Sequence, residues 1–444
     1  MDSTEKLIIK TIEKHREEIL AFARDIYSHG ELGYREYRTS EKFQEVMKKL
    51  GLRTETGLAI TGAKAYLNED RKDKASLALL GEMDALLIPD HPYADPQTGV
   101  AHCCGHNAQL AGVIGAAMAL TVPEVAEKLE GQLVFFAVPA EEYGEIEFKS
   151  QLRRQGKIRY GGGKCELIRI GAFDDIDMCL AHHIRPGENI LTDCGSNNGF
   201  VSKVITYHGR AAHAADAPEK GINALAAASI GLQALGLARE TFRDEDCVRV
   251  HPIVTKGGSL VNVIPDEVVV ETMVRGKTLE AFSDAARKTD RCFMAGALAT
   301  GAEVQIDTAP GYLPQLPMEE LKEFRQAAEL AEPDTPIVPD FAHTAGSSDV
   351  GDLQHLMPVY TFRTGGVRGG LHQADYEVVD EEQAYLAAAE IFALTAYNLL
   401  KDGAARCREL ADSYEPVFKK REEYIRFMDS FDSHRTFSEK DLVK

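Results

Sequence analysis

The sequence predicts an α/β fold on the basis of three observations. Residues 75–80 and 132–138 are continuous apolar runs, as expected of strands that are buried on both faces of a sheet. Residues 108–120, which lie between them, are apolar and rich in small side chains, a composition typical of a core helix. At 444 residues the chain exceeds what one hydrophobic core holds. We therefore predict a mixed sheet with helices on both faces, together with a second, inserted domain.

Two helices are expected before the first strand. Apolar side chains recur at helical spacing over residues 8–26 and again over residues 43–50, where Gly51 ends the pattern. After the second strand, a third apolar run at residues 176–181 predicts another strand of the same sheet. The first part of the principal domain is therefore predicted to span residues 1–195.

The composition changes near Gly195 and predicts an inserted α+β domain at residues 196–311. Strands and two helices are expected within it, at residues 200–207, 221–239, 248–254, 267–274 and 279–295. The α/β pattern resumes over residues 312–402, which we predict to complete the principal domain. Residues 403–444 are charged and have a loose helical spacing of apolar side chains, so we expect a helical C-terminal extension.

Charge and composition argue against several classes of function. A formal net charge of -20 repels nucleic acid and anionic lipid, so we expect neither a nucleic acid nor a membrane as partner. The chain has no run of 18 apolar residues, and its first residues are charged rather than signal-like. Its eight cysteines lack the spacing of a disulfide framework, which predicts a cytoplasmic protein with reduced or metal-bound thiols.

The most informative motif is the run from His102 to Asn107, which contains Cys104 and His106 on either side of a glycine. A thiolate and an imidazole at this spacing can bind one metal ion, although such a pair by itself is more often structural. Glu141 and Glu142, about 35 residues later, offer a further ligand and a general base. A cation that acidifies water and a base that takes its proton are the two requirements of a metal-dependent hydrolase.

Polar side chains follow each of the three predicted strands of the principal domain. The first strand is followed by Glu82 and Asp84, the second by Glu141 and Glu142, and the third by His182 and His183. Ligands of open α/β sheets gather at the carboxyl ends of the strands. We therefore expect these residues to converge on one site.

In the order of its motifs, the chain resembles the M20 family of metallopeptidases and amidohydrolases, in the branch that contains hippurate hydrolase and aminobenzoyl-glutamate hydrolase. The resemblance covers roughly residues 5 to 400. It rests on the segments 30–34, 82–86, 104–107, 139–142, 183–186, 209–214, 261–266, 346–351 and 370–372. It implies a catalytic domain with an inserted dimerisation or lid domain.

The resemblance also implies a set of site residues. The metal ligands would be Cys104, His106, Glu142, His183 and His372, holding one or two ions of Zn²⁺ or Mn²⁺ per subunit. Glu141 would be the general base, and Asp84 and Asp349 would support ligands without touching the metal. His182, His102 and Cys103 are expected to be neighbours, although Cys103 could replace Cys104 if the loop is shifted.

Three residues of the inserted domain complete the implied site. His213 would reach the active site of the partner subunit of a homodimer and stabilise an oxyanion there, assisted by Asn262. Arg275 could hold a carboxylate of the substrate. A surface histidine in a turn is the alternative for His213.

The expected activity is hydrolysis of a C–N bond in an N-acyl or aminobenzoyl amino acid. An aromatic aminohydrolase that releases ammonia from an activated anthranilate, such as 5-nitroanthranilate, is the alternative, and a catalytically silent metal-binding scaffold is a third. A charged insertion at residues 143–160 and another insertion at residues 88–101 depart from the family pattern and flank the metal motifs. They leave the substrate open.

Overall fold

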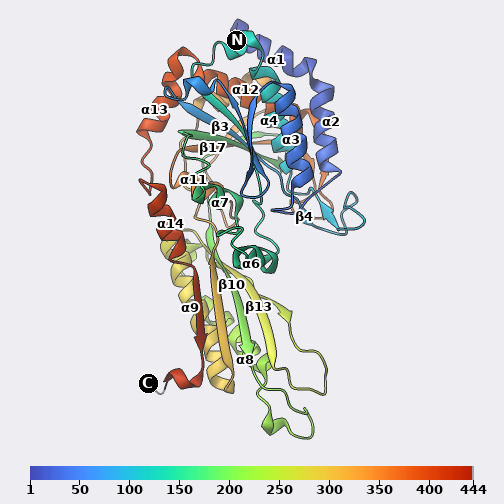
Figure 1. Ribbon diagram of the computed structural model, residues 1–444, viewed down its shortest axis with the longest axis vertical. Helices are drawn as coiled ribbons and strands as arrows, with labels where there is room; N and C mark the ends of the chain where they lie inside the picture. Colours follow the sequence, from blue (N-terminus) through green and yellow to red (C-terminus); the bar gives the residue numbers. More distant parts are fainter. Residues whose placement is uncertain (443–444) are drawn as a thin grey trace. The chain divides into compact units, whose positions relative to one another are not determined.

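The computed structural model describes residues 1–442, and these residues form two compact units (Figure 1). Unit 1 comprises residues 1–195, 317–342 and 352–421. Unit 2 comprises residues 196–316 and 343–351 and the described residues from 422 onward. Among residues 1–442, no helix combines the length and apolar character needed to cross a membrane.

Unit 1 is built on a nine-stranded mixed sheet, which confirms the predicted mixed α/β fold. Its main strand order is β1-β2-β6-β3-β7-β17-β8-β15, and β18 pairs with β17. Strand β3 pairs in parallel with both β6 and β7, and β7 pairs in parallel with β17. The strands are β1 (Arg53–Leu58), β2 (Gly62–Leu67), β3 (Ser76–Glu82), β6 (Gln132–Val138), β7 (Met178–Pro186), β8 (Ile190–Asp193), β15 (Ile337–Asp340), β17 (Val359–Arg368) and β18 (Glu377–Val378).

Apolar helices of unit 1 pack against one another beside this sheet. Helix α4 is buried along its whole length, in keeping with its small apolar side chains, and contacts α12, α2 and α1. The helices are α1 (Ser3–Lys14), α2 (Arg16–Tyr27), α3 (Tyr37–Lys49), α4 (His106–Leu120), α5 (Pro123–Ala126), α6 (Ile146–Arg154), α7 (Gly163–Arg169), α10 (Lys322–Ala331), α12 (Ala387–Leu400) and α13 (Ala405–Ser413). The expected first helix is two helices, because the chain breaks at His15 between α1 and α2.

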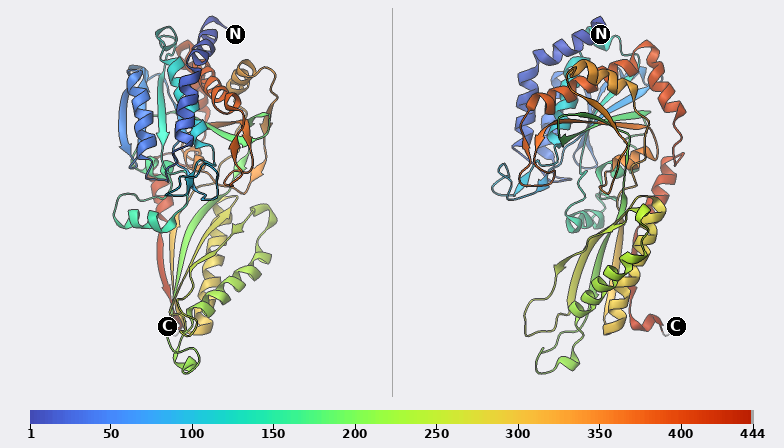
Figure 2. Two further views of the ribbon diagram at one scale, coloured as in Figure 1. Left: turned by 90° about the vertical axis from the view of Figure 1, so that its right-hand side faces the viewer. Right: turned by 180° about the vertical axis from the view of Figure 1, so that it is seen from behind.

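Unit 2 has a six-stranded sheet of order β11-β13-β10-β14-β19, with β12 also paired to β13. Figure 2 shows α8 and α9 together on one face of this sheet. The elements are β10 (Gly199–His208), α8 (Ala224–Ala238), β11 (Arg249–Val250), β12 (Ile253–Lys256), β13 (Glu267–Gly276), α9 (Leu279–Thr300), β14 (Glu303–Pro310), α14 (Arg421–Asp429) and β19 (Ser433–Phe437).

Two sequence-based expectations need correction. The C-terminal extension is not helical throughout, because residues 433–437 form β19, which pairs antiparallel with β14 in unit 2. The segment 312–402 does not belong to one unit, because residues 312–316 and 343–351 fall in unit 2. Both features depend on pairing between segments far apart in sequence, which local periodicity does not report.

A buried carboxyl group on α12 predicts a pH-dependent stability. Burial, together with the carboxylates of Glu332 and Glu13, raises the pKa of Glu390 from 4.5 to about 8. The folded protein then holds this proton more tightly than the unfolded chain, so stability falls as pH rises from about 4.5 to about 8. We expect Glu390→Gln to raise the free energy of unfolding at pH 8 by up to about 4 kcal/mol and to leave it nearly unchanged at pH 4.

Urea unfolding of the wild type and Glu390→Gln at the two pH values measures this difference. Glu127→Gln, at an exposed position of the same unit, is the matched control and should change neither value. An equal gain from Glu390→Gln at both pH values would show that ionisation is not its cause.

Candidate metal centre

A glycine fixes the loop that presents Cys104 and His106. Gly105 has φ +84°, and a Cβ on it would lie 2.0 Å from Cγ2 of Ile184. Only glycine suits both the conformation and the space at this position. His106 is the first residue of α4, so its imidazole lies at the helix start while Cys104 lies on the other side of the turn.

The five residues implied as ligands lie together in unit 1 as two groups that share one thiolate. The first ligand group is Cys104, His106 and His183, and the second ligand group is Cys104, Glu142 and His372. The ligand atoms of each group all lie within 4.8 Å of one another. Cys104 is common to both groups, so these five residues could hold one or two metal ions.

The separations of the ligand atoms fit metal coordination. Sγ of Cys104 lies 3.5 Å from Nε2 of His183 and 3.3 Å from Nε2 of His372. Nε2 of His372 lies 3.1 Å from Oε1 of Glu142. Two ligands bound to one ion at roughly 2.0–2.3 Å are separated by about 3–3.6 Å.

Two buried polar atoms that lack a hydrogen bond also fit metal coordination. Within the described chain, Nε2 of His106 and Oε1 of Glu142 are buried and have no hydrogen-bond partner. Burial, with the nearby Glu142 carboxylate, raises the pKa of the Cys104 thiol well above its usual range. A divalent cation would satisfy both atoms and would favour the thiolate, so these residues fit a metal centre.

Asp84 contacts two of the possible ligands, His106 at the start of α4 and Glu142 after β6. The Nδ1 atom of His106 lies 2.7 Å from the backbone oxygen of Asp84 and 3.2 Å from its Oδ1. The backbone N–H of Glu142 donates to Oδ2 of Asp84 over 2.8 Å. Burial alone would raise the pKa of Asp84, but His106 and the Glu142 N–H hold it at about 2. Asp84 therefore stays ionised and fixes the orientation of the His106 ring.

Glu141 lies beside the ligands but belongs to neither group. Its Oε2 is 3.9 Å from Nε2 of His106, and 9% of the residue is exposed. The backbone that holds it is tightly fixed, because Ala140 has φ +50° and its N–H donates to Oε1 of the buried Glu36 over 2.7 Å. Glu141 thus lies next to the ligand groups, with its backbone position fixed.

Sequence reasoning missed the partner of Glu82. The buried carboxylate of Glu82 forms an ion pair with Lys164 and accepts a hydrogen bond of 2.7 Å from Nε2 of Gln109. Its Oε2 lies 3.1 Å from Nε2 of His106, so Glu82, His106 and Glu141 form a third cluster of possible ligands. The position of Lys164 after a glycine-rich turn does not predict that this lysine is buried.

His182 and Cys103, which adjoin possible ligands in the sequence, contact other parts of the protein interior. Nε2 of His182 lies 2.8 Å from Oγ1 of Thr364, and its ring packs 4.8 Å from that of Phe362. The strand β7 continues through His182 and His183, which therefore lie within it rather than after its end. Cys103 belongs to the hydrophobic core, so the loop register places Cys104 among the ligands.

The residues implied on the inserted domain all lie in unit 2. Nδ1 of His213 accepts hydrogen bonds from the N–H groups of Ala215 and Asp216, at 3.3 and 3.0 Å. The neutral ring therefore carries its proton on Nε2, which leaves that N–H available as a donor. The backbone oxygen of Asn262 accepts from the N–H of Ala214 over 3.0 Å, so the two loops lie side by side.

Arg275 and Asp349 also lie in unit 2. Nη1 of Arg275 donates to Oγ of Ser347 over 3.1 Å, and its guanidinium carbon lies 5.4 Å from the Phe200 ring centre. Asp349 is fully buried.

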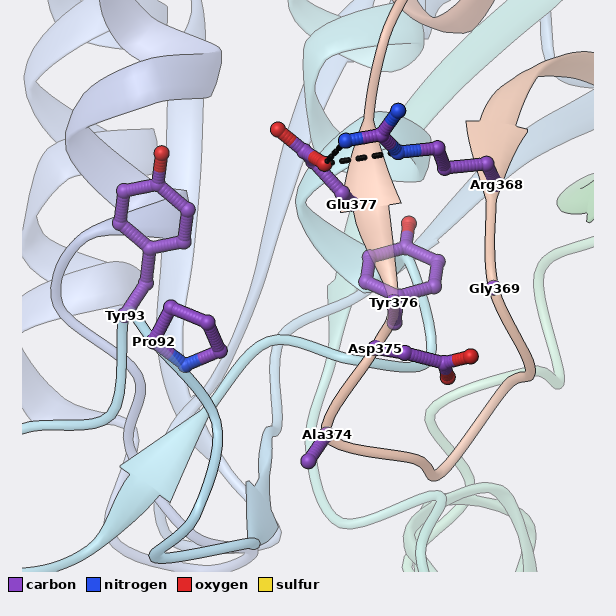
Figure 3. Close-up of a pocket in the computed structure, with 8 residues that line it drawn as sticks. All are labelled: Pro92, Tyr93, Arg368, Gly369, Ala374, Asp375, Tyr376 and Glu377. Atoms are coloured by element: carbon purple, nitrogen blue, oxygen red, sulfur yellow. Dashed lines mark hydrogen bonds and ion pairs between the residues drawn. The ribbon is translucent and has the colours of Figure 1, made fainter.

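A cavity of about 410 Å³ adjoins the loop that contains His372. Figure 3 shows Pro92 and Tyr93 on one side of this cavity and the segment from Arg368 to Glu377 on the other. Arg368 forms an ion pair with Glu377 there. The insertion at residues 88–101 and the His372 loop thus face each other across this cavity.

Comparisons with known proteins identify the family. Residues 78–398 match peptidase family M20/M25/M40. The chain is 29% identical to Xaa-Arg dipeptidase of Homo sapiens over 69% of its length and 68% of the relative. It is 28% identical to N-acetyl-L-cysteine deacetylase of Bacillus subtilis over 60% of each chain.

Solved structures agree with this assignment at the level of the fold. The YXEP protein of Bacillus subtilis, described as a dinuclear metal binding peptidase from M20 family, superposes with a TM-score of 0.62 at 22% identity. The match covers 87% of this chain and 99% of that one. With the family match spanning more than half of its residues, the chain belongs to peptidase family M20/M25/M40, a family of hydrolases.

Proposed function

We propose that the protein is a metal-dependent hydrolase that cleaves the C–N bond of an N-acyl or aminobenzoyl amino acid. The observation that supports this proposal is the pair of ligand groups sharing Cys104, with the Glu141 carboxylate beside them. The names of two relatives, a dipeptidase and an N-acetyl amino acid deacetylase, describe amides of amino acids. Amides of small carboxylates are therefore the substrate class that we expect.

The proposed metal is Zn²⁺ or Mn²⁺, at two ions per subunit. Thiolate, imidazole and carboxylate ligands together suit Zn²⁺, and the nitrogen and oxygen donors also accept Mn²⁺. Bound to these groups, the cations would supply the Lewis acidity that polarises a carbonyl and lowers the pKa of water. His372 is half-exposed whereas His106 is fully buried, so the second ligand group is the side open to substrate.

Side chains of the protein transfer the protons and stabilise the charge that develops during the reaction. Glu141 accepts the proton of the attacking water, and the water oxygen then forms its bond to the carbonyl carbon. The Nε2 proton of His213, from a partner subunit, stabilises the negative charge that develops on the carbonyl oxygen. Glu141 then delivers its proton to the leaving nitrogen as the C–N bond breaks. Asn262 assists His213, and Arg275 pairs with a substrate carboxylate.

The partner subunit in this proposal is a second copy of the chain. Unit 2 exposes large apolar side chains on α8, on the β12 edge strand and on the loop that follows it, namely Leu237, Ile253, Val254, Leu260 and Val261. An exposed apolar surface next to an unpaired strand edge is typical of an interface. We also propose a cytoplasmic location, since the eight cysteines are free thiols, as is usual in a reducing compartment.

Product identification by mass spectrometry tests the activity. The Zn²⁺- or Mn²⁺-loaded protein is incubated with N-acyl and aminobenzoyl amino acids in one panel and with substituted anthranilates in another. Release of a free amino acid is the expected result. Release of ammonia with a hydroxylated ring would instead establish an aromatic aminohydrolase, and a metal-loaded protein inactive on both panels would favour a silent scaffold.

A further inference from the structure

We infer that the two insertions of this chain support the second ligand group, and that binding of the ion at that group depends on them. The inference rests on the proposed two-ion centre. It assigns positioning roles to Lys149, from the insertion at residues 143–160, and to His91, from the insertion at residues 88–101.

Lys149 holds the backbone of the ligand Glu142. Its side chain lies on α6, is only 4% exposed, and its Nζ donates to the backbone oxygen of Glu142 over 2.5 Å. On the other side of the same residue, the N–H of Glu142 donates to Asp84. Both backbone polar groups of Glu142 are therefore fixed, which restricts the direction of its carboxylate.

Aromatic rings surround the buried ammonium group of Lys149. Its Nζ lies 4.9 Å from the ring centre of Tyr143 and 5.8 Å from that of Tyr34, within the range of cation–π attraction. A lysine is rarely buried to this extent unless its charge is compensated. The Tyr34 ring and the Glu142 carbonyl thus both stabilise the charge of the buried Lys149 ammonium group.

The insertion that contains Lys149 is itself attached to the N-terminal region of unit 1. Arg35 forms an ion pair with Glu145, and its guanidinium lies 4.1 Å from the ring centre of Phe148. Near the other end of the insertion, the hydroxyl of Tyr34 donates to the backbone oxygen of Tyr160 over 3.0 Å. The insertion that carries α6 is therefore attached to the N-terminal region near both of its ends.

His91 supports the other ligand of the second group. It is 3% exposed, and its Nε2 donates to the backbone oxygen of Tyr376 over 2.8 Å, while its Nδ1 accepts from the N–H of Tyr93 over 3.2 Å. Tyr376 ends the loop that contains His372. His372 has φ +62°, a conformation that costs a non-glycine residue about 1 kcal/mol and needs support from its surroundings.

The first ligand group is held by other parts of the chain. Asp84 orients His106, and Nδ1 of His183 lies 2.8 Å from the backbone oxygen of Ile184. Loss of Lys149 or His91 should therefore weaken one ion far more than the other. Removing such supporting contacts commonly lowers metal affinity 10- to 100-fold.

Titration of the metal-free protein with Zn²⁺, followed by calorimetry and by metal analysis after dialysis, tests the inference. The wild type should bind two ions. Lys149→Met and His91→Ala should each retain one ion at wild-type affinity and bind the other at least tenfold more weakly. Lys149→Arg, which keeps a cationic donor, should recover most of the lost affinity. Lys157→Met, at an exposed position of the same insertion, is the matched control.

The outcomes separate this inference from the proposed function. Two ions bound by wild type and with unchanged affinity by Lys149→Met and His91→Ala would overturn the inference and leave the two-ion centre intact. Equal weakening of both ions would overturn the selective role of the insertions. A wild type that binds fewer than two ions would overturn the two-ion centre itself. His91→Ala acts through a different loop and decides the question alone if Lys149→Met does not fold.

Discussion

Glu141→Ala is expected to lower kcat by about 10³-fold or more while the protein keeps its full metal content. A positioned general base typically contributes 10²- to 10⁴-fold, and in the proposed reaction Glu141 both accepts and returns the proton. The metal content should not change because Glu141 belongs to neither of the two ligand groups. Steady-state kinetics on the substrate found by product analysis, combined with metal analysis, measures both effects.

Two further variants test whether the loss of activity without loss of metal is specific to Glu141. Glu142→Ala removes a member of the second ligand group and should lose metal as well as activity. Glu147→Ala, at an exposed glutamate of the adjacent helix α6, should retain both. If Glu141→Ala kept substantial activity, the base would have to be another group, and the buried Glu82 of the third cluster would be the first to examine.

His213→Ala should lower kcat by about 10²- to 10³-fold, the usual loss when one donor to a developing oxyanion is removed. The effect should fall on kcat more than on KM, because the donor acts on charge that exists only in the transition state. Metal content should be unchanged, because His213 lies in unit 2 and the ligand groups lie in unit 1.

Mixed dimers of His213→Ala and Glu141→Ala test whether the site is shared between subunits. In such a heterodimer one of the two sites would contain both an intact Glu141 and an intact His213 from the partner. Random mixing should therefore restore about a quarter of the wild-type activity. Heterodimers that are verified by differential tagging and still show no activity would rule out sharing, and His213 would then act within its own chain or not at all.

Local patterns in the sequence predict the parts of the fold that depend on neighbouring residues. The strand expected at residues 132–138 is β6, with the same bounds, because a continuous apolar run leaves only a buried strand or helix and its length favours a strand. Glu82, Asp84 and Glu142, which lie at or just after the carboxyl ends of β3 and β6, are also close together around His106, as expected because neighbouring parallel strands end at the same edge of a sheet.

Non-local contacts explain what the sequence did not reveal. Lys164 pairs with Glu82, which lies 82 residues earlier, and Lys149 contacts Glu142 only because α6 folds back over it. A lysine in a charged segment usually points to solvent, so its burial has no signature in periodicity or composition. The same holds for His91, whose partner Tyr376 is 285 residues away.

The pairing of β19 with β14 can form only late in the synthesis of the chain. Strand β14 ends at Pro310, whereas β19 begins at Ser433, after residues 317–342 and 352–421 of unit 1 have been synthesised. On the ribosome, the outer edge of β14 therefore stays without its neighbour until all of unit 1 has emerged. Open strand edges invite pairing with other chains. The nascent protein is thus most exposed to aggregation late in translation, and a chaperone that shields β14 during this interval should raise the yield of folded protein.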